Sequence, residues 1–259
     1  MFTNTTKQKL ADGHTVVGCL LPLPEPTLAE MLASCGFDFI LLDGEHGLFG
    51  PREIADAARA IELRGATPLA RVTANKEEIV LRFLDAGAHG VQVPSLNSYD
   101  ACEAAVRSTK YGPRGHRGLA GSRMSDFGTT VSIGDYTRIA NEQTMVIGHV
   151  ETAAAVGNIE DFLHVDGLDV IFLGPVDLSH SLGHPGDLNH PDVADAIDTV
   201  ASAVLGSDKV LGVYAPTPDG ARTWMERGAR YILTSFDTFI VEGASRYLSH
   251  LRVEPSVET

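Results

Sequence analysis

Short apolar runs of β type alternate along this chain with segments whose apolar residues recur at helical spacing. The apolar runs cover 15–21, 37–43, 67–72, 89–94, 144–151, 168–175, 209–215 and 230–236. Helical patterns follow at 27–34, 52–63, 76–86, 98–108, 153–163, 191–204, 219–227 and 237–248. Nearly continuous apolar runs are typical of strands buried on both faces, as in a parallel sheet. Eight strands and eight helices in strict alternation predict an α/β fold, a single (β/α)8 TIM barrel over residues 1–259.

A doubly wound sheet is the alternative architecture, because periodicity cannot show whether a sheet closes. No Gly-rich GxGxxG motif follows the first apolar run, which weakens a dinucleotide-binding interpretation. The stretch 109–143 shows neither a β-type apolar run nor helical spacing of its apolar residues, so we expect it to be irregular. Loops of that length inside a compact domain are usually functional or mobile.

Polar residues gather where several of the predicted strands end. The second run passes into LLDGEHG, which places Asp43, Glu45 and His46 directly after a buried strand. Arg71 ends the third run. In a TIM barrel the chemistry lies at the carboxyl ends of the strands, so we expect these side chains to face a shared mouth.

Two further strand ends carry carboxylates. Glu151 ends the fifth run, with His149 two residues before it, and Asp177 follows the sixth run. Two carboxylates on neighbouring strand ends suit a hard divalent cation such as Mg²⁺. Each carboxylate could instead cap a helix or pair with Arg71, so the metal site at Glu151 and Asp177 is a hypothesis with a structural alternative.

His46 is the candidate general base, because an unperturbed imidazole titrates near neutral pH. Asp43 could orient its ring. The planar guanidinium of Arg71 suits a carboxylate or an enolate oxygen, or else an ordinary ion pair inside the barrel. A second histidine cluster, in SHSLGHPGDLNHP, is a weaker metal candidate because it lies in a turn-rich loop.

The composition excludes several classes of partner. The net charge is −14 and no long cluster of lysine and arginine occurs, so neither nucleic acid nor a membrane is expected as a partner. Cys19, Cys35 and Cys102 are widely spaced, and their odd number suits reduced thiols in the cytoplasm, with Cys19 and Cys35 in the core. No apolar run approaches the length of a membrane span and MFTNTTKQKL is not a signal peptide, so we expect a cytoplasmic protein.

Five segments, taken in order and spacing, resemble the HpcH/HpaI aldolase family, the metal-dependent class II pyruvate aldolases. They are FDFILLDGEHG, LARV, FLDAGAHGVQVP, YGPRGHRG and VETAAAVGNIEDFLHVDGLDVIFLGPVDLSHSLGHPG. The resemblance covers about Lys7 to Leu248. It implies a TIM barrel, a divalent metal (Mg²⁺, Mn²⁺ or Co²⁺), a 2-keto acid and an aldehyde as small-molecule partners, and a homohexamer built as a trimer of dimers.

The resemblance also implies roles for the residues around the metal. Glu151 and Asp177 would ligate the ion, and Glu45 would help to hold metal-bound water. The backbone around the turn after the sixth strand would line the pyruvate pocket. That turn consists of Gly174, Pro175 and Val176.

Further roles concern the proton transfer and the substrate. By resemblance, His46 would be the base with Asp43 as its partner, and Arg71 would bind the 2-keto acid and stabilise its enolate. Asp85 matches a residue that reaches a neighbouring subunit's site in the family. One departure stands out: the family usually has glutamine where this chain has His149, and this changes either metal ligation or substrate orientation.

The resulting expectation is a retro-aldol cleavage of a 4-hydroxy-2-keto acid to pyruvate and an aldehyde, and its reverse. No lysine lies at the strand ends that carry the polar residues, which argues against a Schiff-base aldolase. A related condensing enzyme that uses an acyl-CoA or oxaloacetate, as a citrate synthase does, is one alternative, with Arg114, Arg117 and Arg123 accommodating the larger anion. A barrel that binds metal and carboxylate without turnover is the other.

Overall fold

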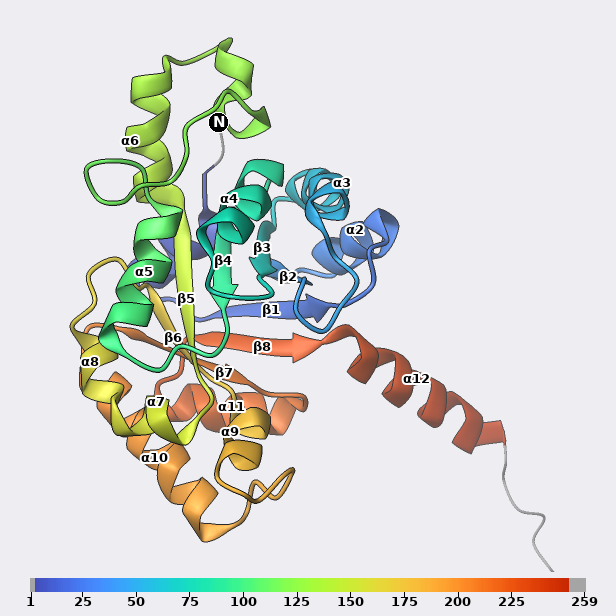
Figure 1. Cartoon of the computed structure of the whole chain (residues 1–259). Coiled ribbons are helices and arrows are strands. Elements are labelled where there is room, and N and C mark those ends of the chain that lie inside the picture. Colours follow the sequence, from blue (N-terminus) through green and yellow to red (C-terminus); the bar gives the residue numbers. More distant parts are fainter. Residues whose placement is uncertain (1–2, 252–259) are drawn as a thin grey trace, which may run out of the picture.

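Eight parallel strands pair in sequence order, and β8 pairs with β1, so the sheet closes into a barrel (Figure 1). The structure is a computed structural model that describes residues 3–251. The closed barrel confirms the predicted (β/α)8 fold and excludes the doubly wound sheet. The strands are β1 Val16–Leu21, β2 Phe39–Asp43, β3 Thr67–Arg71, β4 Gly90–Val93, β5 Met145–Val150, β6 Val170–Leu173, β7 Val210–Tyr214 and β8 Tyr231–Ser235.

A helix follows every strand, and the helix bounds lie mostly within two residues of the predicted ones. They are α2 Pro26–Ser34, α3 Pro51–Glu62, α4 Glu77–Ala86, α5 Tyr99–Thr109, α10 Pro191–Leu205, α11 Pro218–Arg227 and α12 Phe236–Leu251. The single helix expected at 153–163 is wrong, because Asn158 separates α7 Ala153–Gly157 from α8 Ile159–Leu163. Two short helices were not predicted, α1 Thr5–Ala11 and α9 Pro175–Ser181.

The stretch 109–143 is more ordered than expected. It contains the 3-10 helix η1 Arg123–Gly128 and α6 Ile133–Gln143. Ser132 caps α6 by accepting a hydrogen bond from the N–H of Asp135. The stretch has a small core of its own, formed by Tyr111, Met124, Tyr136 and Ala140.

Alternation along each strand divides the apolar residues into two cores. Phe39 and Leu41 of β2 point into the barrel, whereas Ile40 and Leu42 pack against the helices. The barrel interior is filled by side chains, as in other TIM barrels. Gly18 of β1 makes room for this filling, because a Cβ there would lie 2.1 Å from the Phe39 ring.

The last helix differs from the others in its packing. Figure 1 shows α12 running away from the barrel after β8 instead of lying along its wall. None of its residues is buried within the part of the chain that the structure describes. Four of its apolar side chains are more than half exposed: Ile240, Val241, Tyr247 and Leu251. This leaves a long apolar surface without a partner from residues 3–251.

The cysteines are all free thiols, but they are not all in the core. Cys19 and Cys102 are buried, as expected for Cys19. The expectation for Cys35 is wrong: it is exposed at the carboxyl end of α2, where Gly36 turns the chain with φ of +100°. Within residues 3–251, no helix has both the length and the apolar content that crossing a membrane requires.

Candidate active site at the carboxyl ends of the strands

The polar residues at the strand ends belong to the inward-facing set of the barrel. On β2, Phe39 and Leu41 face inward, so Asp43 follows in the same direction. By the same alternation, Arg71 follows Leu69 on the inward face of β3. Arg71, but not Asp43, is among the side chains that line a cavity of about 160 Å³. Its polar walls are Arg71, Gln92, His149, Glu151 and Asp177, its apolar floor is Leu20, Phe172, Tyr214 and Leu233, and Gly174, Pro175 and Val176 form one side.

Arg71 and Asp43 form a bidentate ion pair at the mouth. The Nε of Arg71 donates to Oδ1 of Asp43 over 2.9 Å, and its Nη2 donates to Oδ2 over 2.7 Å. Burial alone would raise the pKa of Asp43, but Arg71 outweighs it and the pKa lies below its ordinary value. The remaining Nη1 of Arg71 lies 3.3 Å from Oε2 of Glu45. Asp43 therefore fixes the guanidinium through Nε and Nη2, whereas Nη1 faces Glu45.

Glu45 and His46 occupy the turn after β2. The backbone N–H groups of both residues donate to Oδ1 of Asp43, over 3.0 and 3.2 Å. Asp43 thus orders the turn through the backbone, and within residues 3–251 no hydrogen bond of the His46 imidazole is found. His46 is exposed at the rim. Burial raises the pKa of Glu45, although Arg71 opposes this.

Glu151 is a buried anion held at both carboxylate oxygens. Its Oε1 accepts from the backbone N–H of Ser95 over 2.6 Å, and its Oε2 lies 2.7 Å from Nδ1 of His149. Burial alone would raise the pKa of Glu151, but the bonds from His149 and Ser95 lower it to about 2. Ser95 has a φ of 55°, in the left-handed region that a non-glycine residue adopts only at a cost. The strained backbone at Ser95 is thus the feature that brings its N–H to Glu151.

Two buried residues that the sequence did not single out complete this part of the site. Gln92 Nε2 lies 2.5 Å from Nε2 of His149, and Gln92 Oε1 accepts from the hydroxyl of Tyr231 over 3.1 Å. The Phe172 ring stacks on His149 with centroids 4.9 Å apart. A glutamine on β4 and a tyrosine on β8 gave no sequence signal beyond their place on predicted strands.

Asp177 enters the mouth from the first turn of α9. Within residues 3–251, no hydrogen bond or ion pair of its carboxylate is found, so it does not cap a helix or pair with Arg71. Gly174 lets this turn approach Glu151, because a Cβ there would lie 3.0 Å from Cβ and 3.1 Å from Oε2 of Glu151. The turn through Pro175 and Val176 lines the cavity, as the resemblance implies.

Asp85 is the predicted residue that the structure places outside the mouth. It lies on α4, where its Oδ1 accepts from Nη2 of Arg117 over 2.6 Å. The Arg117 guanidinium is buried and lies over the Tyr111 ring. Asp85 is partly exposed on the outer face of the barrel, so its predicted role in a neighbouring subunit's site stays a prediction.

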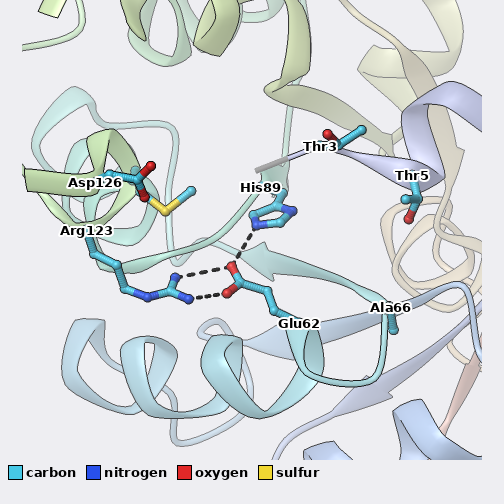
Figure 2. A pocket seen from close by; sticks show the side chains of 9 residues that line it. Thr3, Thr5, Glu62, Ala66, His89, Arg123 and Asp126 are labelled. Atoms are coloured by element: carbon cyan, nitrogen blue, oxygen red, sulfur yellow. Dashed lines mark hydrogen bonds and ion pairs between the residues drawn. The ribbon is translucent and has the colours of Figure 1, made fainter. Parts of the chain in front are cut away.

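A larger cavity, of about 340 Å³, lies at the opposite end of the barrel. Figure 2 shows its centre, where Arg123 and His89 both point to the carboxylate of Glu62. Burial alone would raise the pKa of Glu62, but the bonds from His89 and Arg123 lower it to about 2. Burial lowers the pKa of His89. The amino ends of β3 and β4 meet here, so this closed network stabilises the base of the barrel, away from the mouth.

The second histidine cluster is partly assembled. His184 Nε2 lies 3.1 Å from Oδ2 of Asp192, and Nδ1 of His190 lies 3.8 Å from the same oxygen. These donor atoms are close enough together to hold a metal ion. The two imidazole rings stack face to face, and Nδ1 of His190 accepts from the N–H of Asp192, so one lone pair is already used. His180 is exposed and is not part of this group.

The three arginines of the long loop do not line the mouth cavity. Arg114 pairs with Asp166, Arg117 with Asp85 and Arg123 with Glu62. Arg114 and Arg123 line other cavities, at the amino ends of the strands. The site that the acyl-CoA alternative requires is therefore not formed by these side chains.

Residues 17–244 match the family model described as HpcH/HpaI aldolase/citrate lyase. The chain belongs to this family. It is 35% identical over 242 residues to a 4-hydroxy-2-oxovalerate aldolase of Rhodococcus jostii, covering 92% of each chain. It is 34% identical over 236 residues to a hydroxypyruvate/pyruvate aldolase of Roseobacter denitrificans, covering 90% of this chain and 91% of the relative.

Two solved structures have the same fold. A family member from Burkholderia cenocepacia superposes with a TM-score of 0.92 at 36% identity, covering 97% of this chain and all of that one. A citrate synthase, SbnG, superposes with a TM-score of 0.85 at 28% identity, covering 95% of this chain and 96% of that one. The fold is thus shared by a protein of this family and by a protein named as a citrate synthase.

The residues at the mouth fit the divalent cation on which the class II aldolases of this family generally depend. Glu151 is anionic, and its two bonded oxygens keep further lone pairs. Asp177 lines the same cavity, and no partner of its carboxylate is found among residues 3–251. Two carboxylates with open positions around them are the ligand set that Mg²⁺ and similar hard ions prefer.

Proposed function

We propose that this protein is a divalent-metal-dependent aldolase, with the whole chain acting as one catalytic domain. It would cleave a 4-hydroxy-2-keto acid to pyruvate and an aldehyde, or join the two. The observation that carries the proposal is the mouth cavity, lined by an anionic Glu151, by Asp177 and by Arg71. The names of the curated relatives support the same reaction class.

Glu151 and Asp177 would hold the metal ion. Bound there, the ion would supply Lewis acidity to the ketone oxygen of the substrate. Arg71 would receive the substrate's oxyanion through Nη1, the nitrogen that does not bond Asp43, in exchange for its 3.3 Å ion pair with Glu45. Because two of its nitrogens are held by Asp43, the guanidinium needs no reorganisation when negative charge develops.

His46 would move the proton. It would accept the proton of the 4-hydroxyl as the C3–C4 bond breaks, so that the aldehyde leaves and the bonding electrons form the enolate of pyruvate. A proton delivered to C3 then completes pyruvate. Glu45, with its raised pKa, is suited to share a proton or a hydrogen bond with water at the rim. The apolar floor of Phe172 and Leu233 would limit the access of bulk water to the enolate.

We also propose that the protein assembles into a homohexamer, a trimer of dimers, in the cytoplasm. The exposed apolar residues of α12 support self-association, since contiguous apolar surface of this kind is typical of an interface. In such an assembly Asp85, held by Arg117, would serve the site of a neighbouring subunit. Free thiols and the acidic net charge of −14 fit the cytoplasm.

Metal-dependent pyruvate release tests the proposed reaction. The protein is stripped with EDTA, Mg²⁺, Mn²⁺ or Co²⁺ is restored, and pyruvate is followed from a panel of 4-hydroxy-2-keto acids. We expect turnover that needs metal and disappears in Glu151→Ala. Glu160→Ala, which removes an exposed carboxylate of α8, is the matched control and should retain full activity.

Parallel samples separate the alternatives. Oxaloacetate decarboxylation requires only enolate stabilisation, so decarboxylation without aldol cleavage would indicate a different condensing reaction. Condensation of oxaloacetate with an acyl-CoA would identify the citrate-synthase-like alternative directly. Metal binding without any turnover would refute the aldolase and favour a binding protein.

A further inference from the structure

A buried chain of hydrogen bonds crosses the barrel beneath the mouth. It runs from Tyr231 on β8 through Gln92 on β4 to His149 on β5 and ends at Glu151. The four residues are at most 6% exposed. We propose that Gln92 and Tyr231 are positioning residues that hold His149 as the Nδ1–H tautomer, so that it donates to Glu151 and fixes the carboxylate for the metal.

The direction of the chain follows from which atoms can donate. The Gln92 Oε1 carries no hydrogen, so the hydroxyl of Tyr231 must donate to it. The amide nitrogen of Gln92 always carries hydrogens, so it donates across 2.5 Å to Nε2 of His149. A neutral imidazole carries one N–H, which then lies on Nδ1 and donates to Glu151 over 2.7 Å.

The opposite direction leaves groups unsatisfied. If the amide of Gln92 were reversed, the buried hydroxyl of Tyr231 would accept, and its own hydrogen would have no acceptor among residues 3–251. The Nε2 of His149 would then carry the hydrogen, and a neutral ring would turn the Nδ1 lone pair toward the Glu151 carboxylate. An unsatisfied buried hydroxyl and two opposed lone pairs both cost free energy.

Stacking of aromatic rings also restricts the orientation of His149. Phe172 stacks on His149, and it meets Tyr231 edge to face with centroids 6.0 Å apart. His149 therefore has little freedom to rotate away from Gln92. With Ser95 donating to Oε1 and His149 donating to Oε2, the Glu151 carboxylate is held at both oxygens. Its remaining lone pairs are the ones available to the ion.

The tautomer is tested on the metal-free protein by solid-state ¹⁵N NMR at pH 8 with ¹⁵N-labelled histidine. His149→Gln identifies the signals of His149 by their loss. We expect a protonated Nδ1 and an unprotonated Nε2. In Gln92→Glu the new carboxylate can only accept from the imidazole, so Nε2 should become protonated. A wild-type spectrum with a protonated Nε2, as the other tautomer or as the imidazolium, would overturn the proposal.

The positioning of Glu151 should also strengthen metal binding, an expectation that rests on the proposed function. Calorimetric titration with Mn²⁺ tests it. Loss of partners beyond the ligands costs roughly 10–100-fold in metal affinity, and we expect a loss of this size in Gln92→Glu and a smaller one in Tyr231→Phe. Tyr136→Phe removes a buried hydroxyl that bonds Tyr111, far from the mouth, and should leave the affinity unchanged. An unchanged affinity in both site variants would refute the positioning role, whether or not the protein cleaves aldols. If Gln92→Glu fails to fold, the wild-type spectrum and Tyr231→Phe still decide.

Discussion

The close approach of Gly174 to Glu151 predicts a sharp effect of adding one methyl group. In Gly174→Ala, the new Cβ would lie 3.0 Å from Cβ and 3.1 Å from Oε2 of Glu151. The φ of −99° at residue 174 is accessible to alanine, so the backbone conformation there does not oppose the substitution. Glu151 must give way by a few tenths of an ångström, and because its Cβ is one of the two contacted atoms, the whole side chain must move and not the carboxylate alone. Such a shift lengthens the hydrogen bonds from Ser95 and His149, which are 2.6 and 2.7 Å long.

The expected magnitude follows from the strictness of metal geometry. Mg²⁺ demands near-ideal octahedral ligands at about 2.0–2.1 Å, so a shift of this size disturbs ligation. We expect Gly174→Ala to weaken Mn²⁺ or Mg²⁺ binding by roughly 10–100-fold, the range seen when the supports of a ligand are removed. That corresponds to about 1.4–2.7 kcal/mol. Calorimetric titration of the stripped protein measures it directly.

Gly157→Ala is the matched control. It adds the same methyl group to α7, where no atom lies within 4 Å of the new Cβ. It should bind metal as the wild type does. Thermal unfolding of both variants separates a local effect on the site from a loss of fold. If folded Gly174→Ala bound Mn²⁺ with wild-type affinity, Glu151 would not be the ligand that the geometry indicates.

Three other perturbations test the base of the barrel, the mouth and the proposed assembly. Because the pKa of Glu62 is about 2 and its ordinary value is 4.5, its contribution to stability is complete above about pH 4.5 and is lost as the pH falls toward 2. Glu62→Gln should therefore remove on the order of 3 kcal/mol of pH-dependent stability, and urea unfolding at pH 7, 4 and 3 should show a flatter profile than the wild type. Arg71→Lys keeps the charge but cannot pair with Asp43 in bidentate fashion. We therefore expect the free energy of unfolding in urea to fall by about 1–3 kcal/mol and turnover to fall strongly. An unchanged free energy of unfolding and unchanged turnover would contradict the role of this pair. Ile240→Asp on the exposed face of α12 should change the unfolding free energy by less than about 0.5 kcal/mol but reduce the oligomer size in sedimentation, and unchanged assembly would refute α12 as an interface.

The fold was predictable because each barrel strand is buried on both faces. The run FILLD, residues 39–43, has no polar position before its end, and the strict alternation of strands and helices leaves few other topologies. The strand ends also predicted the residues Arg71, Glu151 and Asp177, which line one cavity in the structure. Asp43 and Arg71 were expected at adjacent strand ends, and the structure places them as direct partners in the β2–β3 register.

The features of the site that could not be predicted depend on contacts between residues that are distant in the sequence. Tyr231 and Gln92 are separated by 139 positions, and each alone reads as an ordinary strand residue. The φ of 55° at Ser95 has no sequence signal, because serine rarely adopts it and nothing local requires it. The direction of α12 was equally hidden. Its apolar residues predict a helix but do not say which barrel wall, its own or a neighbour's, the helix covers.

The distribution of apolar and charged side chains along the barrel axis connects these features to the proposed chemistry. Phe39, Phe172 and Leu233 contribute apolar side chains to the interior, and the charged side chains of Arg71 and Glu151 lie at the carboxyl ends of their strands. Charges placed on an apolar floor interact more strongly than the same charges in water, because less solvent screens them. Arg71 and Glu151 therefore gain from having their partners fixed in advance, Asp43 for one and His149 with Ser95 for the other. An enolate formed between them would meet dipoles that are already oriented, which is the arrangement that lowers a barrier without reorganisation.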